Sequence, residues 1–146
     1  MVEVLNETSS AIPANRIAGA LEALVARHDT LQRDVTVVMV GAETIQAHNR
    51  RDRGVDDTTD VLSYPTHEPD DTEMPPVPHL GDVLVCVDVA RDQAAAAGRS
   101  FDDEVVTLAA HGTMHLLGFD HATDEAWRPF HEAQQQAVAW RPKPGS

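Results

Sequence analysis

Apolar residues recur along the chain with two spacings, one typical of helices and one typical of strands. Ile17, Leu21 and Leu24 fall on one face of a helix, because residues three and four apart project from the same side. The β-branched run 34–40 ends at Gly41 and predicts a strand. By the same criteria helices are predicted over residues 12–28, 43–53, 91–97 and 124–140. A further helix is predicted to start at residue 100 and to include residues 111 and 115. Strands are predicted over residues 2–5, 34–40, 60–64 and 82–89.

The balance of these elements predicts an α+β fold. Helices outnumber the short strands, so we expect a mixed sheet of about four strands packed against several helices. A chain of 146 residues is the size of one domain, which we place at residues 1–140. Residues 141–146 are predicted to be a disordered tail. Residues 66–79 hold four prolines and four acidic residues, and they are predicted to be a mobile surface loop.

A run of histidines in the C-terminal half carries the strongest chemical signal. His111 and His115 are four residues apart, so on the helix that Ser100 is predicted to cap their rings project from one face. Gly118 adopts left-handed backbone angles at little cost, and a turn there can bring His121 back toward the first two rings. Three imidazoles leave one position open on a tetrahedral Zn²⁺, which is the arrangement of a catalytic zinc site. The alternative is a set of surface or core histidines that happen to share a helix face.

The residue after the first histidine separates two kinds of hydrolase. The spacing H-x-x-x-H-x-x-G-x-x-H is that of the extended zinc-protease motif, in which a glutamate after the first histidine is the general base. Here that position is Gly112, so a peptidase mechanism would lack a central group. Two routes remain: the metal alone can lower the pKa of water, or the substrate can supply its own nucleophile, as RNA does through its 2′-hydroxyl.

Composition limits the possible partners and the cellular setting. The net charge is −13 with only 11 basic residues, which argues against general nucleic-acid binding, because that requires Lys and Arg to neutralise phosphates. Arg50, Arg51 and Arg53 form a tight basic cluster, which predicts either a local phosphate grip or a solvated helix face. The single cysteine, Cys86, excludes an intrachain disulfide and a Cys-based zinc site, and we expect it to be a buried apolar residue. The sequence shows no signal-peptide pattern and no membrane span, so we expect a cytoplasmic protein without a membrane partner.

The histidine run resembles the signature of a known family. In the YbeY family of bacterial endoribonucleases the signature is H-G-x-x-H-L-x-G-[YF]-D-H, and residues 111–121 match every fixed position. Residues 48–65 are similar to a second family motif, with matches at Asn49, Arg53, Asp56, Thr59, Asp60, Val61, Leu62, Ser63 and Pro65. Residues 81–86 are similar to a third, G-D-[IV]-x-[IV]-C. The three motifs occur in the family's order.

This resemblance implies a single-strand-specific, metal-dependent endoribonuclease. Family members are implicated in maturing the 3′ end of small-subunit ribosomal RNA and in ribosome quality control. The implied partners are therefore single-stranded and ribosomal RNA, with ribosomal proteins or the small subunit as further candidates. The resemblance also implies that His111, His115 and His121 bind one Zn²⁺ per chain and that Arg53 contacts the scissile phosphate. Arg53 and His111 are the expected catalytic residues.

Other residues near these motifs receive subsidiary roles. Asp120 can either orient a ligand imidazole or close the turn that follows the helix. Asp82 and Ser63 can line the cleft, although structural roles are expected for both. His131 is expected on a helix surface. Val55 stands where the family pattern has lysine, which removes a cation near the expected RNA site.

Two other functions stay open at this point. A zinc peptidase is disfavoured by Gly112. A non-catalytic ribosome assembly factor with a structural zinc site is compatible with the strong acidity of the chain, because ribosomal proteins are typically basic partners.

Overall fold

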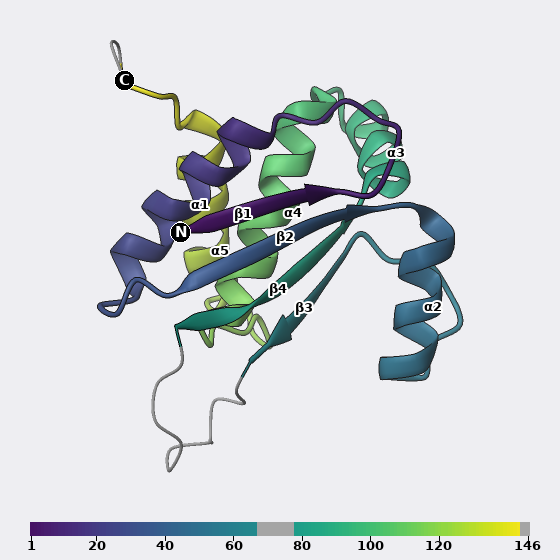
Figure 1. Cartoon of the computed structure of the whole chain (residues 1–146), viewed down its shortest axis with the longest axis horizontal. Coiled ribbons are helices and arrows are strands. Elements are labelled where there is room, and N and C mark those ends of the chain that lie inside the picture. The colour runs from purple at the N-terminus through teal and green to yellow at the C-terminus, as the bar shows by residue number, and fades with distance from the viewer. Residues whose placement is uncertain (67–77, 144–146) are drawn as a thin grey trace.

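A four-stranded sheet forms the centre of the computed structural model, which describes residues 1–66 and 78–143 (Figure 1). Its strands are β1 (Val2–Asn6), β2 (Asp34–Val40), β3 (Val61–Pro65) and β4 (His79–Cys86). Their order is β1–β2–β4–β3, with the first three parallel and β3 antiparallel to β4. The helices are α1 (Ala14–His28), α2 (Ala42–Arg53), α3 (Val87–Ala97), α4 (Phe101–Leu116) and α5 (Trp127–Ala139). The predicted α+β fold with a mixed sheet is confirmed.

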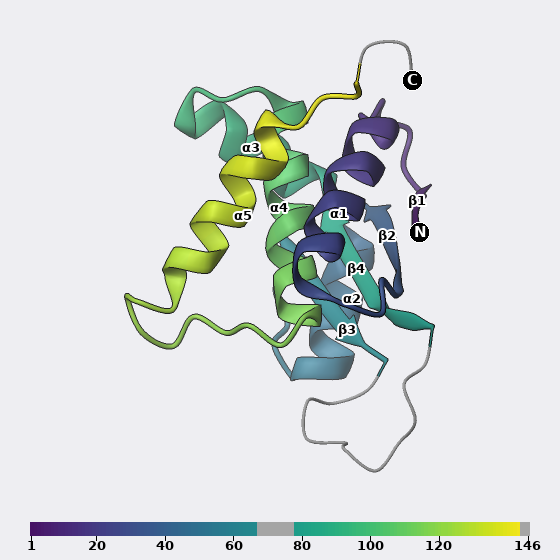
Figure 2. The same ribbon diagram turned by 90° about the vertical axis from the view of Figure 1, so that its left-hand side faces the viewer.

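Side chains alternate along the central strands and so divide the core in two. Val83 and Val85 of β4 point into the larger cluster, which α1 and α4 cover, and α5 packs on the outer side of these helices (Figure 2). Leu84 and Cys86 point to the opposite face, where Ile45 of α2 covers them. Cys86 is fully buried in this second cluster, as predicted. The sheet is therefore covered on one face by a helical layer and on part of the other by α2.

The predicted strand over residues 82–89 is wrong at both ends. The strand spans His79–Cys86, and α3 begins immediately at Val87. The apolar run continues across this junction because Val87 and Ala90, three residues apart, are buried on one face of the helix. Apolar residues alone cannot mark where a buried strand passes into a buried helix.

The remaining boundaries agree with the prediction to within a few residues. The strand predicted over residues 60–64 extends to Pro65, which an edge strand tolerates because one side of it needs no donor. Pro129 lies in the first turn of α5, where a proline removes no hydrogen bond of the helix. Residues 67–77 and 144–146, which make up most of the predicted loop and half of the predicted tail, lie outside the described residues. Among residues 1–66 and 78–143, no helix is long and apolar enough to cross a bilayer.

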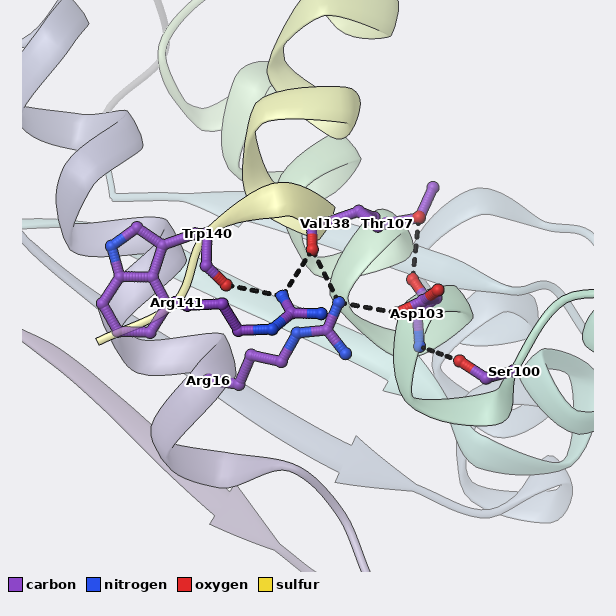
Figure 3. A network of polar contacts seen from close by, with 7 residues as sticks. All are labelled: Arg16, Ser100, Asp103, Thr107, Val138, Trp140 and Arg141. Carbon is purple, nitrogen blue, oxygen red and sulfur yellow. Dashed lines mark hydrogen bonds and ion pairs between the residues drawn. The ribbon is translucent and has the colours of Figure 1, made fainter. Parts of the chain in front are cut away.

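A polar network ties the three helices of the larger layer together (Figure 3). The hydroxyl of Ser100 accepts from the backbone N–H of Asp103 at 3.0 Å and so caps α4, as the sequence predicted. The Asp103 carboxylate is not free to complete a capping box, because it accepts from the Arg16 guanidinium at 2.6 Å. The same nitrogen of Arg16 donates to the carbonyl of Val138 at 2.8 Å. One side chain of α1 therefore joins the start of α4 to the end of α5.

Replacing Arg16 with Met is expected to lower the free energy of unfolding by about 1–2 kcal/mol, because it leaves the Asp103 carboxylate and the Val138 carbonyl without this charged donor. The measurement is urea unfolding of the metal-stripped protein. The matched control is Arg27→Met on the exposed side of α1, which should change stability by less than about 0.5 kcal/mol. Equal losses in the two variants would contradict this role.

Candidate metal centre

Three histidine side chains converge at the end of α4. His111 and His115 lie one turn apart on that helix, and their Nε2 atoms are 3.2 Å from each other. The helix ends at Leu116, and Gly118 takes a φ of 96°, a left-handed value that turns the chain back toward the helix. This turn places His121 so that one nitrogen from each of the three rings lies within 4.8 Å of the others. The convergence predicted from the spacing is confirmed.

The arrangement fits a tetrahedral ion with nitrogen ligands. Such an ion at about 2.0–2.1 Å from each nitrogen requires ligand atoms about 3.3 Å apart, close to the 3.2 Å between His111 and His115. Burial, together with the neighbouring His115 and His121, lowers the pKa of His111 to about 4. Burial and His121 also lower the pKa of His115. Both rings are therefore neutral near pH 7, and neutral imidazole is the form that binds a metal.

The first turns of α5 supply a second layer of contacts around the triad. The indole of Trp127 stacks on the His121 ring, with centroids 4.0 Å apart and planes 12° apart. The fully buried ring of Phe130 lies 5.0–5.1 Å from all three imidazoles. The side-chain amide nitrogen of Gln134 lies 3.2 Å from Nδ1 of His111. These three residues hold the rings in place from the side opposite the sheet.

These α5 contacts were not predicted from the sequence. The signal was present, because Trp127, Phe130 and Gln134 follow one another at spacings of three and four and so share a helix face. Nothing local shows, however, that this face meets the histidines of α4 and not solvent. That contact depends on how α5 packs on α4.

The packing of α4 on the sheet leaves no room for a side chain at position 112, where glycine also cannot serve as a base. A Cβ built at this position would lie 2.5 Å from Cγ1 of Val83 and 3.0 Å from Cγ2 of Val61. The carbonyl of Gly112 also accepts from the hydroxyl of Ser63 at 2.9 Å. α4 therefore lies directly on β3 and β4 at this point, and a glutamate at position 112 would require the side chain of Val83 or the helix to move.

A cleft of about 520 Å³ opens in front of the triad. Its lining combines the three histidines and Asp120, from the turn after α4, with residues at the end of α2 and in the β3 region, namely Arg53, Thr59, Asp60, Val61, Ser63 and Pro65. The charge of Arg53 contributes to the lowered pKa of His115, which indicates that the guanidinium and the triad lie in one electrostatic environment. The cleft thus brings together the two groups that the sequence placed far apart, Arg53 and the histidine run.

The sequence left two roles open for the arginines at positions 50, 51 and 53: binding a phosphate or forming a solvated helix face. Arg53 ends α2 and lines the cleft. Arg51 instead donates to the carboxylate of Asp52 at 2.8 Å and is exposed, and Arg50 is also exposed. All three arginines are exposed, and Arg53 is the member of the cluster that also lines the cleft.

A tyrosine fixes the end of α2 against the sheet. The hydroxyl of Tyr64 on β3 donates to the Asp52 carboxylate at 2.7 Å. The hydrogen bonds from Arg51 and Tyr64 hold the pKa of Asp52 well below its usual range, and burial together with Asp52 raises the pKa of Tyr64 to about 12. A phenylalanine at this position could not form this bond, so the hydroxyl of Tyr64 adds a tether one residue before Arg53.

The subsidiary residues take mostly structural positions. Asp120 lines the cleft, and its carboxylate accepts from the backbone N–H of His121 at 2.8 Å, which is the turn role. Ser63 also lines the cleft while bonding to α4. Asp82 pairs with His79 at 2.8 Å. His131 is exposed on α5, as predicted, and stacks on the Trp127 indole.

Comparison with known proteins places the whole chain in one family. The sequence model of the family described as Endoribonuclease YbeY matches residues 3–140, nearly the full length. The chain belongs to the YbeY family. The resemblance inferred from the three motifs is thereby confirmed, while the ligand roles of the histidines and the phosphate role of Arg53 stay predictions.

Several YbeY relatives, each described as Endoribonuclease YbeY, show how far the similarity extends. The one from Thermus thermophilus is 44% identical over 124 residues, covering 85% of this chain and 88% of the relative. The one from Geobacillus kaustophilus is 39% identical over 150 residues, covering 94% of each chain. The solution structure of a Thermotoga maritima protein matches with a TM-score of 0.66 and 28% identity, covering 94% of this chain and 87% of that one.

The lowered pKa of His111 predicts how the stability of this YbeY family member depends on pH. Below pH 6.5 the unfolded chain takes up a proton that folded His111 does not bind until about pH 4, so stability is lost as the pH falls through this window. We expect a loss on the order of 2 kcal/mol, less than the full shift would give because the ring is partly exposed. The measurement is urea unfolding of EDTA-treated protein between pH 4 and 7.

The matched controls are His111→Asn and His131→Asn. The first should reduce the pH dependence, because asparagine has no proton to bind in this range and the shifted His115 remains, whereas the second changes an exposed ring and should keep the slope. An unchanged slope in His111→Asn would show that another group is responsible.

Proposed function

We propose that this protein is a metal-dependent endoribonuclease that cuts single-stranded RNA. The observation that carries the proposal is the cleft in which the histidine triad and Arg53 meet, in a chain of the YbeY family. We further propose that it acts in the cytoplasm, through the domain of residues 1–140, in maturing the 3′ end of small-subunit ribosomal RNA and in ribosome quality control. These roles rest on the family resemblance.

The proposed cofactor is one Zn²⁺ bound by His111, His115 and His121. The spacing and neutrality of the imidazoles fit this ion, since three nitrogen ligands with an open fourth position are typical of catalytic zinc. When bound, the ion supplies Lewis acidity toward a phosphoryl oxygen and water. The α5 side chains Trp127 and Phe130 keep the rings in position and cover them from solvent on that side.

Arg53 is the proposed phosphate-binding group. Its guanidinium can donate two parallel hydrogen bonds to phosphate oxygens and stabilise the charge that grows on them in the transition state. Asp60 and Asp120 also line the cleft, and their carboxylates repel phosphates from the rest of its wall. A local grip of this kind, on one phosphate and not on a long backbone, is compatible with a net charge of −13.

The acidity of the chain favours basic ribosomal proteins as additional partners. Under the alternative of a non-catalytic assembly factor, such contacts would be the main activity and the metal would be structural. The peptidase alternative has no support at Gly112, where packing against Val83 leaves no room for a glutamate.

Removing the metal or one ligand is expected to abolish RNA cleavage. Purified protein should cut single-stranded RNA. EDTA or the His115→Ala substitution should lower the cleavage rate by about 10³-fold or more, because the proposed ion supplies most of the charge stabilisation in the transition state. Cleavage is followed on denaturing gels, and zinc is then added back to the EDTA-treated protein to test whether the activity returns. The matched control is Gln136→Ala, at an exposed position of α5, which should retain full activity.

The outcomes separate the three functions. RNA left intact by the wild-type protein with every metal tested would overturn the nuclease proposal. Hydrolysis of casein would then support a peptidase. Ribosome binding by an inactive His115→Ala protein, with no RNA cleavage by the wild type, would support the assembly factor.

The phosphate role of Arg53 predicts loss of activity without loss of metal. Arg53→Ala should lower the cleavage rate by about 10²–10³-fold, the usual effect of removing one transition-state donor, and leave the zinc content unchanged. Arg50→Ala, on the exposed part of the same helix, is the matched control. Zinc content is measured by atomic absorption, and loss of zinc in Arg53→Ala would show that the residue supports the metal site instead.

A further inference from the structure

Gln134 is the polar side chain of α5 that faces the histidine triad. Its amide nitrogen lies 3.2 Å from Nδ1 of His111, while Nε2 of the same ring lies 3.2 Å from Nε2 of His115. The two nitrogens of His111 therefore have separate partners: Nε2 faces the other histidines, and Nδ1 faces α5. Gln134 is the group that meets the side of this ring turned away from the proposed ion.

The position of one proton decides whether Nε2 of His111 can bind a metal. A neutral imidazole carries a single N–H, so a metal on the lone pair of Nε2 requires the proton to be on Nδ1. Nδ1 is then a donor and needs an acceptor. A carboxamide provides one, because a half-turn of its end group exchanges nitrogen and oxygen in the same two places, and Oε1 of Gln134 then accepts from Nδ1–H.

We propose that Gln134 is a positioning residue for His111, which fixes the ring proton on Nδ1 and aims Nε2 at the metal. The inference rests on the proposed function, since it assumes that the triad holds an ion. Phe130 contacts the same ring at 5.0 Å and restricts where the ring lies, but an apolar ring cannot select a tautomer. Gln134 also lines a groove of about 390 Å³ between α4 and α5, so water would reach Nδ1 if its side chain were shortened.

The choice of substitution follows from that groove. Gln134→Ala would admit a water molecule that could accept from Nδ1 in place of the amide. Gln134→Leu fills a similar volume and offers no acceptor, whereas Gln134→Glu retains an oxygen at the same reach. Gln136→Leu makes the same change at an exposed position of α5 and is the matched control.

Zinc affinity is measured for the four proteins by competition with a chromophoric chelator. Gln134→Leu is expected to bind Zn²⁺ about 10–100-fold more weakly, the usual effect of losing a partner of a ligand histidine. Gln134→Glu should bind at least as tightly as the wild type, and Gln136→Leu should match the wild type. In zinc-loaded protein, ¹⁵N–¹H NMR should show the Nδ1–H of His111, shifted downfield in Gln134→Glu because its acceptor becomes a carboxylate.

Each outcome decides the question. Wild-type affinity in Gln134→Leu would overturn the inference and leave the proposed function intact, whereas absence of zinc binding by the wild type would overturn both. If Gln134→Leu does not fold, the NMR comparison of the wild type with Gln134→Glu decides instead. An unshifted or missing Nδ1–H signal there would exclude the role of Gln134.

Discussion

The direct contact of α4 with the sheet at Gly112 is the constraint on which the site depends. With no side chain at that position, the helix backbone lies against Val61 and Val83 and accepts a hydrogen bond from Ser63. This contact places His111 and His115 over the β3 edge, where the end of α2 also arrives. If a side chain at position 112 separated α4 from the sheet, the histidines would lie further from Arg53 and would not share a cleft with it.

Electrostatics explain how an acidic chain can carry a site for an anionic polymer. Burial and mutual proximity keep His111 and His115 neutral, so the triad itself adds no charge that would hinder the binding of a cation. The positive charge of the site is instead concentrated in Arg53 and the proposed ion. Elsewhere on α2, Arg51 is paired with Asp52 and Arg50 points to solvent, so the helix does not extend the phosphate-binding site.

Much of the fold and of the site was predictable because the signals are local. Helical spacing placed His111 and His115 on one face, and Gly118 marked the turn that returns His121. Boundaries failed where burial hides the pattern: the junction between β4 and α3 lies within one apolar run. Trp127 and Gln134 were missed because helical spacing shows that residues share a face but not which other element that face contacts.

The sequence by itself therefore determined the element types, the histidine convergence and the absence of a peptidase base at Gly112. Each follows from residues close together in the chain, whose geometry is set by helix and turn periodicity. The family motif singled out Arg53, but only the tertiary structure decided that Arg53 lines one cleft with the histidines, and that Gln134 meets His111. These pairs are distant in sequence, and their contact depends on the packing of α2 and α5, which no local pattern specifies.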